Sequence, residues 1–363
     1  MKKRILIVNW RDIKNPEAGG AEVHLHEIFN RFDPARFDIT LIASEYPNGP
    51  AEEQVGNIRV LRRGGRELFN FWVYANIRRY ARRLGADLVV DDVNKIPFFL
   101  PRLLDRPVLA FFHHLFDRTI YNEFSLLPAT YVYLSEKLIG AGYRNAPFTA
   151  VSPSTMGELR AKGLDGAKGK IVYNGIDLAR YTPGGPKEPF HLLFLGRIKK
   201  YKNPGFLLLA AERLKQEFPA LRLTIAGGGD YLPELKKQAQ HLDYVRFTGV
   251  ISEETKIELY RKAALFVNPS IKEGWSITNI EASACGTPVV ASDAPGLRDS
   301  VKPGVNGFLF EYGNLDAFCD AVRRVLSNAG EAARLSAGAR AFAENYSWDA
   351  SAAAMQQIVE GLL

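Results

Sequence analysis

Two carboxylates stand eight positions apart in the stretch KEGWSITNIEASACGTPVVAS, at Glu273 and Glu281. Thr278 and Glu281 fit the capping-box spacing S/T-x-x-E, in which the glutamate only satisfies an amide at the start of a helix. That explanation leaves Glu273 without a role. Two carboxylates flanking a helix N-terminus could instead accept hydrogen bonds from two separate sets of hydroxyl groups. A nucleotide-sugar, with sugar hydroxyls, a diphosphate and ribose hydroxyls, has that arrangement.

A second candidate for chemistry is the basic stretch RIKKYKNP, which carries four cations within six residues, from Arg197 to Lys202. It follows an apolar run that is typical of a strand, and loops after strands are where ligands bind in parallel sheets. An arginine can clamp two phosphate oxygens while a lysine supplies a mobile point charge. The stretch therefore favours a diphosphate site, with a solvated basic loop as the alternative.

Glycines form a third kind of candidate. Gly19 and Gly20 precede a predicted helix, where backbone amides can approach an anion closely and the helix dipole favours it. The pair matches neither G-x-G-x-x-G nor the P-loop, and a plain turn explains it equally well. The run IAGGGD, residues 225–230, is another glycine-rich loop after a predicted strand.

Apolar runs and helical segments alternate along the chain, a rhythm that predicts an α/β protein with parallel, doubly wound sheets. Predicted strands in the first half are 4–10, 37–44, 57–63, 86–92, 107–113, 148–152 and 170–175. Predicted strands in the second half are 190–196, 221–229, 245–249, 265–270, 287–292 and 307–311. Predicted helices are 21–31, 69–84, 131–138, 204–217, 232–241, 252–262 and 279–284, with a helical tail over 315–363 broken at Gly330 and near NYSWD.

The segment YTPGGPKEP, residues 181–189, is rich in proline and glycine and is the best candidate for a linker between two domains. At 363 residues the chain is also too long for one ordinary core. Two doubly wound domains joined in this way are expected to face each other across a cleft. The functional residues should then lie in loops at the carboxyl ends of the strands.

The composition, 47% hydrophobic and 24% charged, is that of a globular protein. The first apolar run ends at Asn9, which is too short for a signal peptide, and no window predicts a transmembrane helix. Cys285 and Cys319 are the two cysteines, so a disulfide framework and a metal–thiolate cluster are excluded. These features predict a cytoplasmic protein.

Nearly all of the net charge of +7 lies in residues 1–180. It peaks in the aromatic-rich stretch 62–84, which carries Arg78, Arg79, Arg82 and Arg83. Such a helix could lie on an anionic membrane surface or meet a phosphorylated acceptor. A core helix with a solvated arginine face is the alternative. Nucleic acid is disfavoured as a partner, because the basic stretch is one helix long and no recognition module accompanies it.

These residues together resemble glycosyltransferase family 4, whose retaining enzymes have the GT-B fold and an E-x7-E motif, here Glu273 to Glu281. The resemblance covers nearly the whole chain. Its pieces, in order, are GGAE at 19–22, FHH at 112–114, NGID at 174–177, GRIKKYK at 196–202, GGG at 227–229 and ACGTPVVASDAPGLRD at 284–299. Each piece is weak by itself, whereas the ordered set is strong.

The resemblance implies roles for particular residues. Glu273 would contact donor-sugar hydroxyls, Glu281 would hold the ribose, and Arg197 with Lys202 would neutralise the leaving diphosphate. His113 would lie beside the donor sugar, with the adjacent His114 as the alternative. Further donor-binding positions implied by the family are Gly19, Gly20, Gly196, Gly228, Val250, Gly274, Trp275, Ser276, Ile277 and Thr278. A glycine is common in the family where Ser276 stands.

The resemblance also implies an organisation and a chemistry. Residues 1–183 would form an acceptor-binding domain, 184–345 a nucleotide-sugar-binding domain, and 346–363 a helix crossing back onto the first. No metal or cofactor would be required, because arginine, lysine and helix amides neutralise the phosphate. On this interpretation Asp91 and Asp92 are loop or acceptor-side groups rather than metal ligands.

The implied function is retaining transfer of a hexosyl group from a UDP- or GDP-sugar to an acceptor hydroxyl. A glycan or lipid-linked acceptor in envelope glycan, polysaccharide or glycolipid synthesis is expected, with the protein cytoplasmic or peripheral at the inner membrane face. Two alternatives stay open: a nucleotide-sugar epimerase of similar architecture, which would need no acceptor, and a non-catalytic protein that binds sugar nucleotides.

Overall fold

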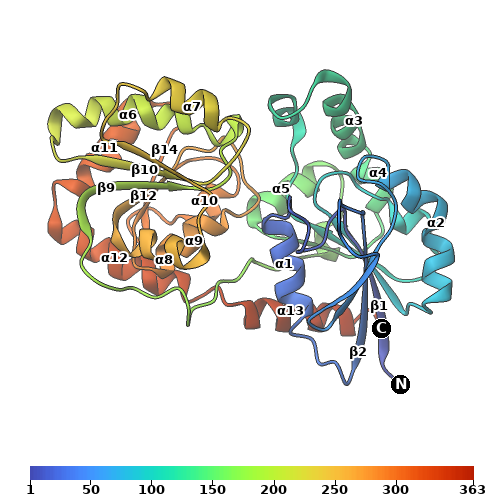
Figure 1. Ribbon diagram of the computed structural model, residues 1–363. Helices are drawn as coiled ribbons and strands as arrows, with labels where there is room; N and C mark the ends of the chain where they lie inside the picture. Colours follow the sequence, from blue (N-terminus) through green and yellow to red (C-terminus); the bar gives the residue numbers. More distant parts are fainter. The chain divides into compact units, whose positions relative to one another are not determined.

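The computed structural model describes all 363 residues and divides into two compact units (Figure 1). The first unit contains Met1–Gly175 together with Trp348–Leu363, and the second contains Ile176–Ser347. Each unit has its own sheet and its own core. The predicted fold class, two doubly wound α/β domains, is confirmed.

The first unit is built on an eight-stranded sheet in the order β3-β4-β2-β1-β5-β6-β7-β8. Its strands are β1 (Lys3–Val8), β2 (Phe37–Ala43), β3 (Glu52–Val55), β4 (Ile58–Arg62), β5 (Leu88–Val93), β6 (Val108–Phe112), β7 (Phe148–Ala150) and β8 (Gly169–Ile171). All pairs are parallel except the β3–β4 hairpin. The strand order reverses between β1 and β5, and the loops at this switch point are where a ligand is expected.

The helices of the first unit are α1 (Gly20–Phe29), α2 (Phe69–Arg83), α3 (Leu126–Lys137), α4 (Ile139–Tyr143), α5 (Pro153–Ala161) and α13 (Trp348–Glu360). Three short 3₁₀ segments cover 100–102, 117–122 and 166–168. The last helix, α13, packs against α1 (Figure 1). An ion pair between Arg31 Nε and Asp349 Oδ1, 2.8 Å apart, joins the segment just after α1 to α13.

The second unit is built on six parallel strands in the order β11-β10-β9-β12-β13-β14. These are β9 (Glu188–Leu195), β10 (Arg222–Ala226), β11 (Val245–Gly249), β12 (Ala263–Asn268), β13 (Val289–Ser292) and β14 (Gly307–Phe310). Its helices are α6 (Pro204–Glu217), α7 (Leu232–Gln238), α8 (Glu253–Lys262), α9 (Ile277–Ala284), α10 (Leu297–Ser300), α11 (Leu315–Leu326) and α12 (Ala329–Ala343). The switch point of this sheet lies between β9 and β12.

The sequence explains these elements locally. Strand β6, VLAFF, is buried at every position, as expected for a parallel strand covered on both faces. Helix α11 buries Phe318, Val322 and Val325 on one side, at the spacing of a helical face, and the Asn314 side chain caps its first turn. In both elements, the residues that the sequence pattern predicts to be buried are buried in the structure.

Several boundaries differ from the predicted ones. The helical tail breaks before Ala329 rather than at Gly330, because the Asn328 side chain accepts a hydrogen bond from the Glu331 amide and starts α12 there. Helix α3 begins at Leu126, ahead of the predicted residue 131. Strand β3 and helices α4, α5 and α10 were not predicted, because they are short or lack a clear apolar period.

The predicted linker is packed rather than free. Tyr181 is 3% exposed, and its hydroxyl donates a hydrogen bond to Glu281 Oε1 at 3.1 Å. Arg261 Nε donates to the Thr182 carbonyl at 2.7 Å. These contacts attach the segment to the second unit, so the division between the units falls after Gly175 instead of at the predicted 183/184.

Candidate functional site

The loops that follow β9 and β10 pack against each other through their backbones. A Cβ atom on Gly227, whose φ is +129°, would lie 2.0 Å from the Gly196 carbonyl oxygen. A Cβ on Gly229 would lie 2.2 Å from the Ile198 carbonyl oxygen. Two of the three glycines in IAGGGD therefore serve this close approach, which fixes the loop that carries Arg197.

The loops that follow β9 and β12, the two strands at the switch point, bring Lys202 and Glu273 together. Lys202 Nζ lies 2.6 Å from Glu273 Oε1, and both side chains are largely buried. Burial by itself lowers the pKa of Lys202, but the neighbouring Glu273 carboxylate outweighs burial and holds that pKa above its ordinary value. The lysine is therefore a fixed positive charge at neutral pH.

Arg197 lies beside this pair. Its side chain is exposed and forms no hydrogen bond or ion pair, and its charge acts to lower the pKa of Lys202. Two cations held near each other, one of them without an anionic partner, form an arrangement that attracts a phosphate. The structure thus brings together Arg197, Lys202 and Glu273, which the sequence separates by up to 76 positions.

Helix α9 begins at Ile277, so the amides of Ile277 and Thr278 belong to its first turn, where backbone donors have no partner inside the helix. Ser276 precedes them with φ +58°, a conformation that favours glycine. The Asn268 side chain donates a hydrogen bond to the Ser276 hydroxyl at 3.0 Å and supports this backbone. Ser276 therefore has the left-handed backbone conformation that a glycine, expected at this position from the family resemblance, would adopt readily.

Glu281 does not cap helix α9, so the capping-box interpretation is wrong. The carboxylate lies more than one turn inside the helix. Its Oε1 accepts hydrogen bonds from Lys256 Nζ at 2.8 Å and from the Tyr181 hydroxyl, and its Oε2 accepts one from the Tyr260 hydroxyl at 2.9 Å. Since a carboxylate oxygen can accept two hydrogen bonds, Oε2 can take one more donor.

The other predicted positions in the second unit also lie in loops that follow strands. Trp275 is 2% exposed and meets Tyr346 edge-on, with ring centroids 5.0 Å apart, so its ring packs inside the unit. Val250 is 84% exposed at the end of β11. A Cβ on Gly228 would lie 2.8 Å from Val250 Cγ2, so these two residues are in contact.

In the first unit, His113 follows β6 directly and pairs with an aspartate. His113 Nε2 lies 2.5 Å from Asp92 Oδ1, and both side chains are buried. Burial raises the pKa of Asp92, and the interaction with His113 opposes that rise. The ring of His114 instead meets Phe116, with ring centroids 4.5 Å apart. The carboxylate therefore orients His113.

The interpretation of Asp91 and Asp92 as loop or acceptor-side groups is wrong. Both lie inside β5 and are at most 1% exposed. Asp91 Oδ2 accepts hydrogen bonds from the Tyr143 hydroxyl at 2.6 Å and from the Leu100 amide at 2.9 Å. Burial nevertheless raises the pKa of Asp91 to about 7. An apolar strand with an aspartate pair at its end looks like a loop boundary in the sequence, although the chain is still in the sheet there.

The glycine pair stands at a helix start, as the sequence predicts, with α1 beginning at Gly20. The Gly19 amide is already engaged, because it donates to Glu22 Oε2 at 2.6 Å. Glu22 Oε1 in turn accepts a hydrogen bond from Asn94 at 2.5 Å. Glu22 thus ties the loop after β1 to the loop after β5, the two loops at the switch point of the first unit.

Several residues around these sites could not be found from the sequence. Glu281 is surrounded by two residues of α8, Lys256 and Tyr260, and by Tyr181 from the segment before β9. Arg62 and Asp12 form a fully buried ion pair, 2.8 Å between Nε and Oδ2, that holds the loop after β1. Each partnership joins segments far apart in the chain, and no short motif signals it.

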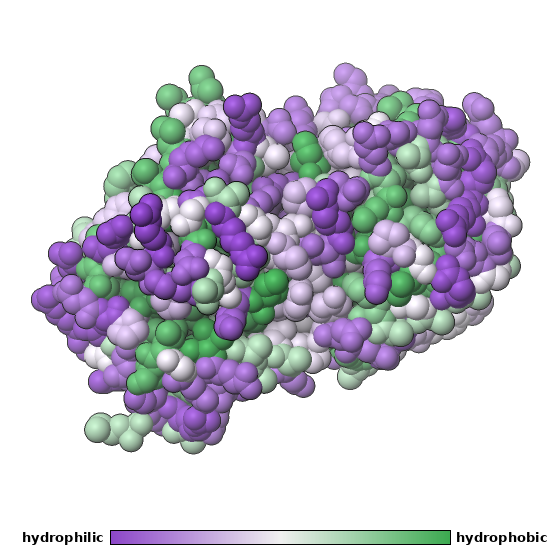
Figure 2. Space-filling view, turned by 180° about the vertical axis from the view of Figure 1, so that it is seen from behind, coloured by the Kyte–Doolittle hydropathy of each residue, from purple (hydrophilic) through white to green (hydrophobic).

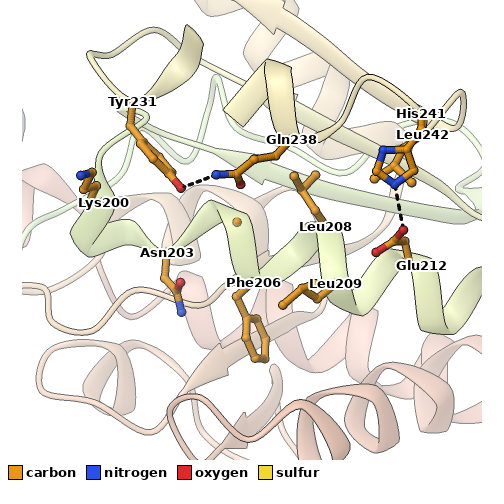
Figure 3. A pocket seen from close by; sticks show the side chains of 11 residues that line it. Lys200, Asn203, Phe206, Leu208, Leu209, Glu212, Tyr231, Gln238, His241 and Leu242 are labelled. Atoms are coloured by element: carbon orange, nitrogen blue, oxygen red, sulfur yellow. Dashed lines mark hydrogen bonds and ion pairs between the residues drawn. The ribbon is translucent and has the colours of Figure 1, made fainter. Parts of the chain in front are cut away.

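A separate hollow of about 670 Å³ lies between α6 and α7 (Figure 3). Of the four cations in the basic stretch it includes only Lys200, and none of the predicted site residues lines it. Four of its polar side chains interact in pairs: Gln238 donates to the Tyr231 hydroxyl, and His241 pairs with Glu212. Since the hollow contains none of the predicted donor-binding residues, it is not part of the candidate site.

No group of three or more His, Cys, Asp or Glu side chains is arranged to hold a metal ion. None of the helices combines the length and the apolar character needed to cross a membrane.

Family models cover most of the chain. Residues 18–180 match the model described as glycosyltransferase family 4, and residues 179–342 match the model described as glycosyl transferases group 1. A D-inositol 3-phosphate glycosyltransferase of Streptomyces bingchenggensis is 32% identical over 254 residues, 64% of this chain and 55% of the relative. One of Geodermatophilus obscurus is 37% identical over 209 residues, 52% of this chain and 46% of the relative. The chain thus spans about half the length of the curated relatives it matches.

Solved structures share the fold over the whole chain. Sucrose-phosphate synthase from Thermosynechococcus elongatus has a TM-score of 0.83 at 23% identity, covering 99% of both chains. Anabaena HepE, solved with UDP and glucose, has a TM-score of 0.78 at 19% identity, covering 99% of this chain and 100% of that one. WaaG, a glycosyltransferase involved in lipopolysaccharide biosynthesis, has a TM-score of 0.76 at 16% identity, covering 98% and 100%.

Proposed function

We propose that this chain, which belongs to glycosyltransferase family 4, transfers a hexosyl group from a nucleoside diphosphate sugar to an acceptor hydroxyl. One observation carries the proposal. At the switch point of the second unit, Lys202 and Glu273 lie 2.6 Å apart beside an exposed Arg197 that has no partner. This group offers positive charge for a diphosphate and a carboxylate for sugar hydroxyls, next to the first-turn amides of α9.

The diphosphate would bind to Arg197, Lys202 and the amides of Ile277 and Thr278. Charge grows on the leaving phosphate as the glycosidic bond breaks, and donors that are already in place stabilise it without further reorganisation. In the structure Glu273 is the partner of Lys202. A bound donor would take over part of that role, leaving Glu273 to accept hydrogen bonds from the sugar.

The nucleoside would bind farther along the same sheet edge. Glu281 Oε2 has capacity for a ribose hydroxyl, and the exposed apolar contact between Val250 and Gly228 suits the face of a base. HepE, which shares the fold, was solved with UDP and with UDP-glucose. We therefore put UDP-sugars first and GDP-sugars second as donors.

The proposed reaction retains the configuration of the anomeric carbon and needs no metal. The bond between the anomeric carbon and the diphosphate oxygen breaks, the acceptor oxygen bonds to the same face of that carbon, and the acceptor proton passes to the departing phosphate. The diphosphate charge would be neutralised by Arg197, Lys202 and helix amides. We further propose that His113, oriented by Asp92, contributes to turnover from the first unit.

For the acceptor we propose a hydroxyl of an envelope glycan, a polysaccharide or a glycolipid. The named relatives act on D-inositol 3-phosphate, so that compound belongs among the candidates. The exposed face formed by Arg78, Arg79, Arg82 and Arg83 is consistent with a peripheral position at an anionic membrane surface on the cytoplasmic side.

Titration calorimetry with UDP-glucose and GDP-glucose, on the native chain and on Glu281→Ala, tests the donor site. Binding of one nucleotide class that is lost in the variant would support it. If neither donor binds, the proposed function is wrong.

Incubating the donor without an acceptor separates the alternatives, because an epimerase would produce a new isomer. Transfer that persists in EDTA would support metal independence, and transfer restored only by a divalent ion would refute it.

A further inference from the structure

Large apolar side chains are exposed along one side of α3. Leu127 is 82% exposed, Leu134 55% and Tyr131 40%, and Leu138, just after the helix, is 57% exposed. These positions follow one another at intervals of four, three and four residues, which places them on one helical face. We call this face, Leu127, Tyr131, Leu134 and Leu138, the α3 stripe.

The α3 stripe is not needed for the core. The opposite side of α3 packs Ala129 and Val132, both buried, against Ile96 and Ile120. That contact already attaches the helix to the first unit. Contiguous exposed apolar surface of this kind is uncommon in soluble monomers and marks an interaction site.

The stripe is continuous with the basic face of α2. The Phe71 ring, 55% exposed, stacks on Tyr131 with ring centroids 6.4 Å apart, and the Tyr131 hydroxyl contacts Asn70. Seven and eleven residues after Phe71, on the same side of α2, stand Arg78 and Arg82, both exposed. An apolar surface on α3 therefore passes into a cationic surface on α2.

The space-filling view is consistent with this arrangement. Figure 2 shows the molecule from behind, so that α3, at the upper right in Figure 1, lies at the upper left. Hydrophobic side chains, in green, gather there. Hydrophilic side chains, in purple, prevail at the edge that α2 occupies.

We propose that the α3 stripe inserts into an anionic lipid surface while the α2 arginines contact its headgroups. Apolar insertion beside a cluster of arginines is the combination by which amphipathic helices bind anionic membranes. A second copy of the chain is a poorer occupant, because a symmetric contact would bring two sets of like charges together. The inference rests on the proposed function and deepens it, since a lipid-linked acceptor would be met at this surface.

Flotation with two kinds of vesicle tests the inference: phosphatidylcholine alone, and equal parts of phosphatidylcholine and phosphatidylglycerol. The native chain should float with the anionic vesicles only. The double variant Leu127→Gln/Leu134→Gln should lose about tenfold or more in partitioning, because two exposed apolar side chains no longer enter the lipid. Leu209→Gln is the matched control, since this leucine is also exposed, at 58%, but lies on α6 of the second unit.

The arginines are tested separately with Arg82→Gln/Arg83→Gln. Binding should weaken, and the part that remains should depend less on salt, because the cationic contribution is screened and the apolar one is not. As a direct probe, Tyr131→Trp should show a blue-shifted emission with anionic vesicles.

Two results would overturn the inference. One is vesicle binding that is unchanged in Leu127→Gln/Leu134→Gln. The other is a dimer of the native chain that the same variant converts to monomers, which would make the stripe a contact between copies. Calorimetry with UDP-glucose on the same variants keeps the questions apart: lost vesicle binding with intact donor binding concerns this surface, whereas absent donor binding in the native chain concerns the proposed function.

Discussion

Lys202 Nζ lies 2.6 Å from Glu273 Oε1, so the residue expected to neutralise a diphosphate and the residue expected to hold the sugar are bound to each other. The two side chains come from loops after different strands, and both are largely buried. A charge that is buried beside its counter-ion becomes costly when the counter-ion is removed. The pair therefore holds the two loops together and supplies the groups that a donor would contact.

A double-mutant cycle with Lys202→Met and Glu273→Gln should reveal this coupling. Each single variant leaves one polar group without its partner, so we expect the two effects on the free energy of unfolding to differ from additivity by about 1–3 kcal/mol. Urea unfolding of the four proteins measures it. The exposed pair Arg213 and Asp316 provides the control cycle and should show far weaker coupling. Additive effects at Lys202 and Glu273 would contradict a structural role for the pair.

Arg197→Ala should affect catalysis without affecting stability. The side chain is exposed and makes no contact that the fold needs, so the free energy of unfolding should stay within about 0.5 kcal/mol of the native value. Turnover should fall by about 100-fold or more, with a smaller change in donor affinity, because the guanidinium acts on charge that develops in the transition state. Arg222→Ala, on the exposed start of β10, is a suitable control. Native turnover in Arg197→Ala would remove the leaving-group role.

Asp92→Asn should lower turnover through His113. The amide cannot hold the ring as a carboxylate does, and loss of such an orienting partner typically costs about 10–100-fold. Donor affinity measured by calorimetry should stay close to that of the native chain, and the pH profile of turnover should shift. His114→Ala should have a much smaller effect, because Asp92 pairs with His113, whereas the His114 ring meets Phe116. The opposite ranking would assign the role to His114.

Gly227→Ala tests whether the loops at the switch point are held by their backbones. The new Cβ would meet the Gly196 carbonyl oxygen at 2.0 Å, and the residue has φ +129°, which alanine rarely adopts. We expect a loss of about 1–3 kcal/mol in unfolding free energy, with reduced donor binding as the Arg197 loop moves. Gly157→Ala is the control, because a Cβ there meets nothing within 4 Å inside helix α5. Equal stability of the two variants would refute the packing argument.

The sequence predicts the fold well where the apolar pattern of a segment alone determines whether it is a helix or a strand. Helix α6 matches its predicted bounds, and β6 lies within its predicted range, because continuous apolar runs and a clear helical period leave few alternatives. The loops holding Arg197 and Glu273 could be placed for the same reason, since both follow predicted strands. The partnerships of Glu281 with Lys256 and of His113 with Asp92 could not, because they depend on which segments the sheet order brings together.

Asp91 should make stability depend on pH between about 4 and 7. Burial raises the pKa of Asp91 to about 7 in the folded chain, above the value of 3.8 for an exposed aspartate. Between these two values the folded state binds the proton more tightly than the unfolded state. The stabilisation that this proton gives is therefore complete below the lower value and is lost as the pH rises through the higher one.

Asp91→Asn carries no titrating group, so its stability relative to the native chain should improve across this range by about 2–4 kcal/mol. Urea unfolding at several pH values checks the slope, with Asp105→Asn, at an exposed site before β6, as the control. A difference between Asp91→Asn and the native chain that does not change with pH would show that Asp91 titrates normally in the folded protein.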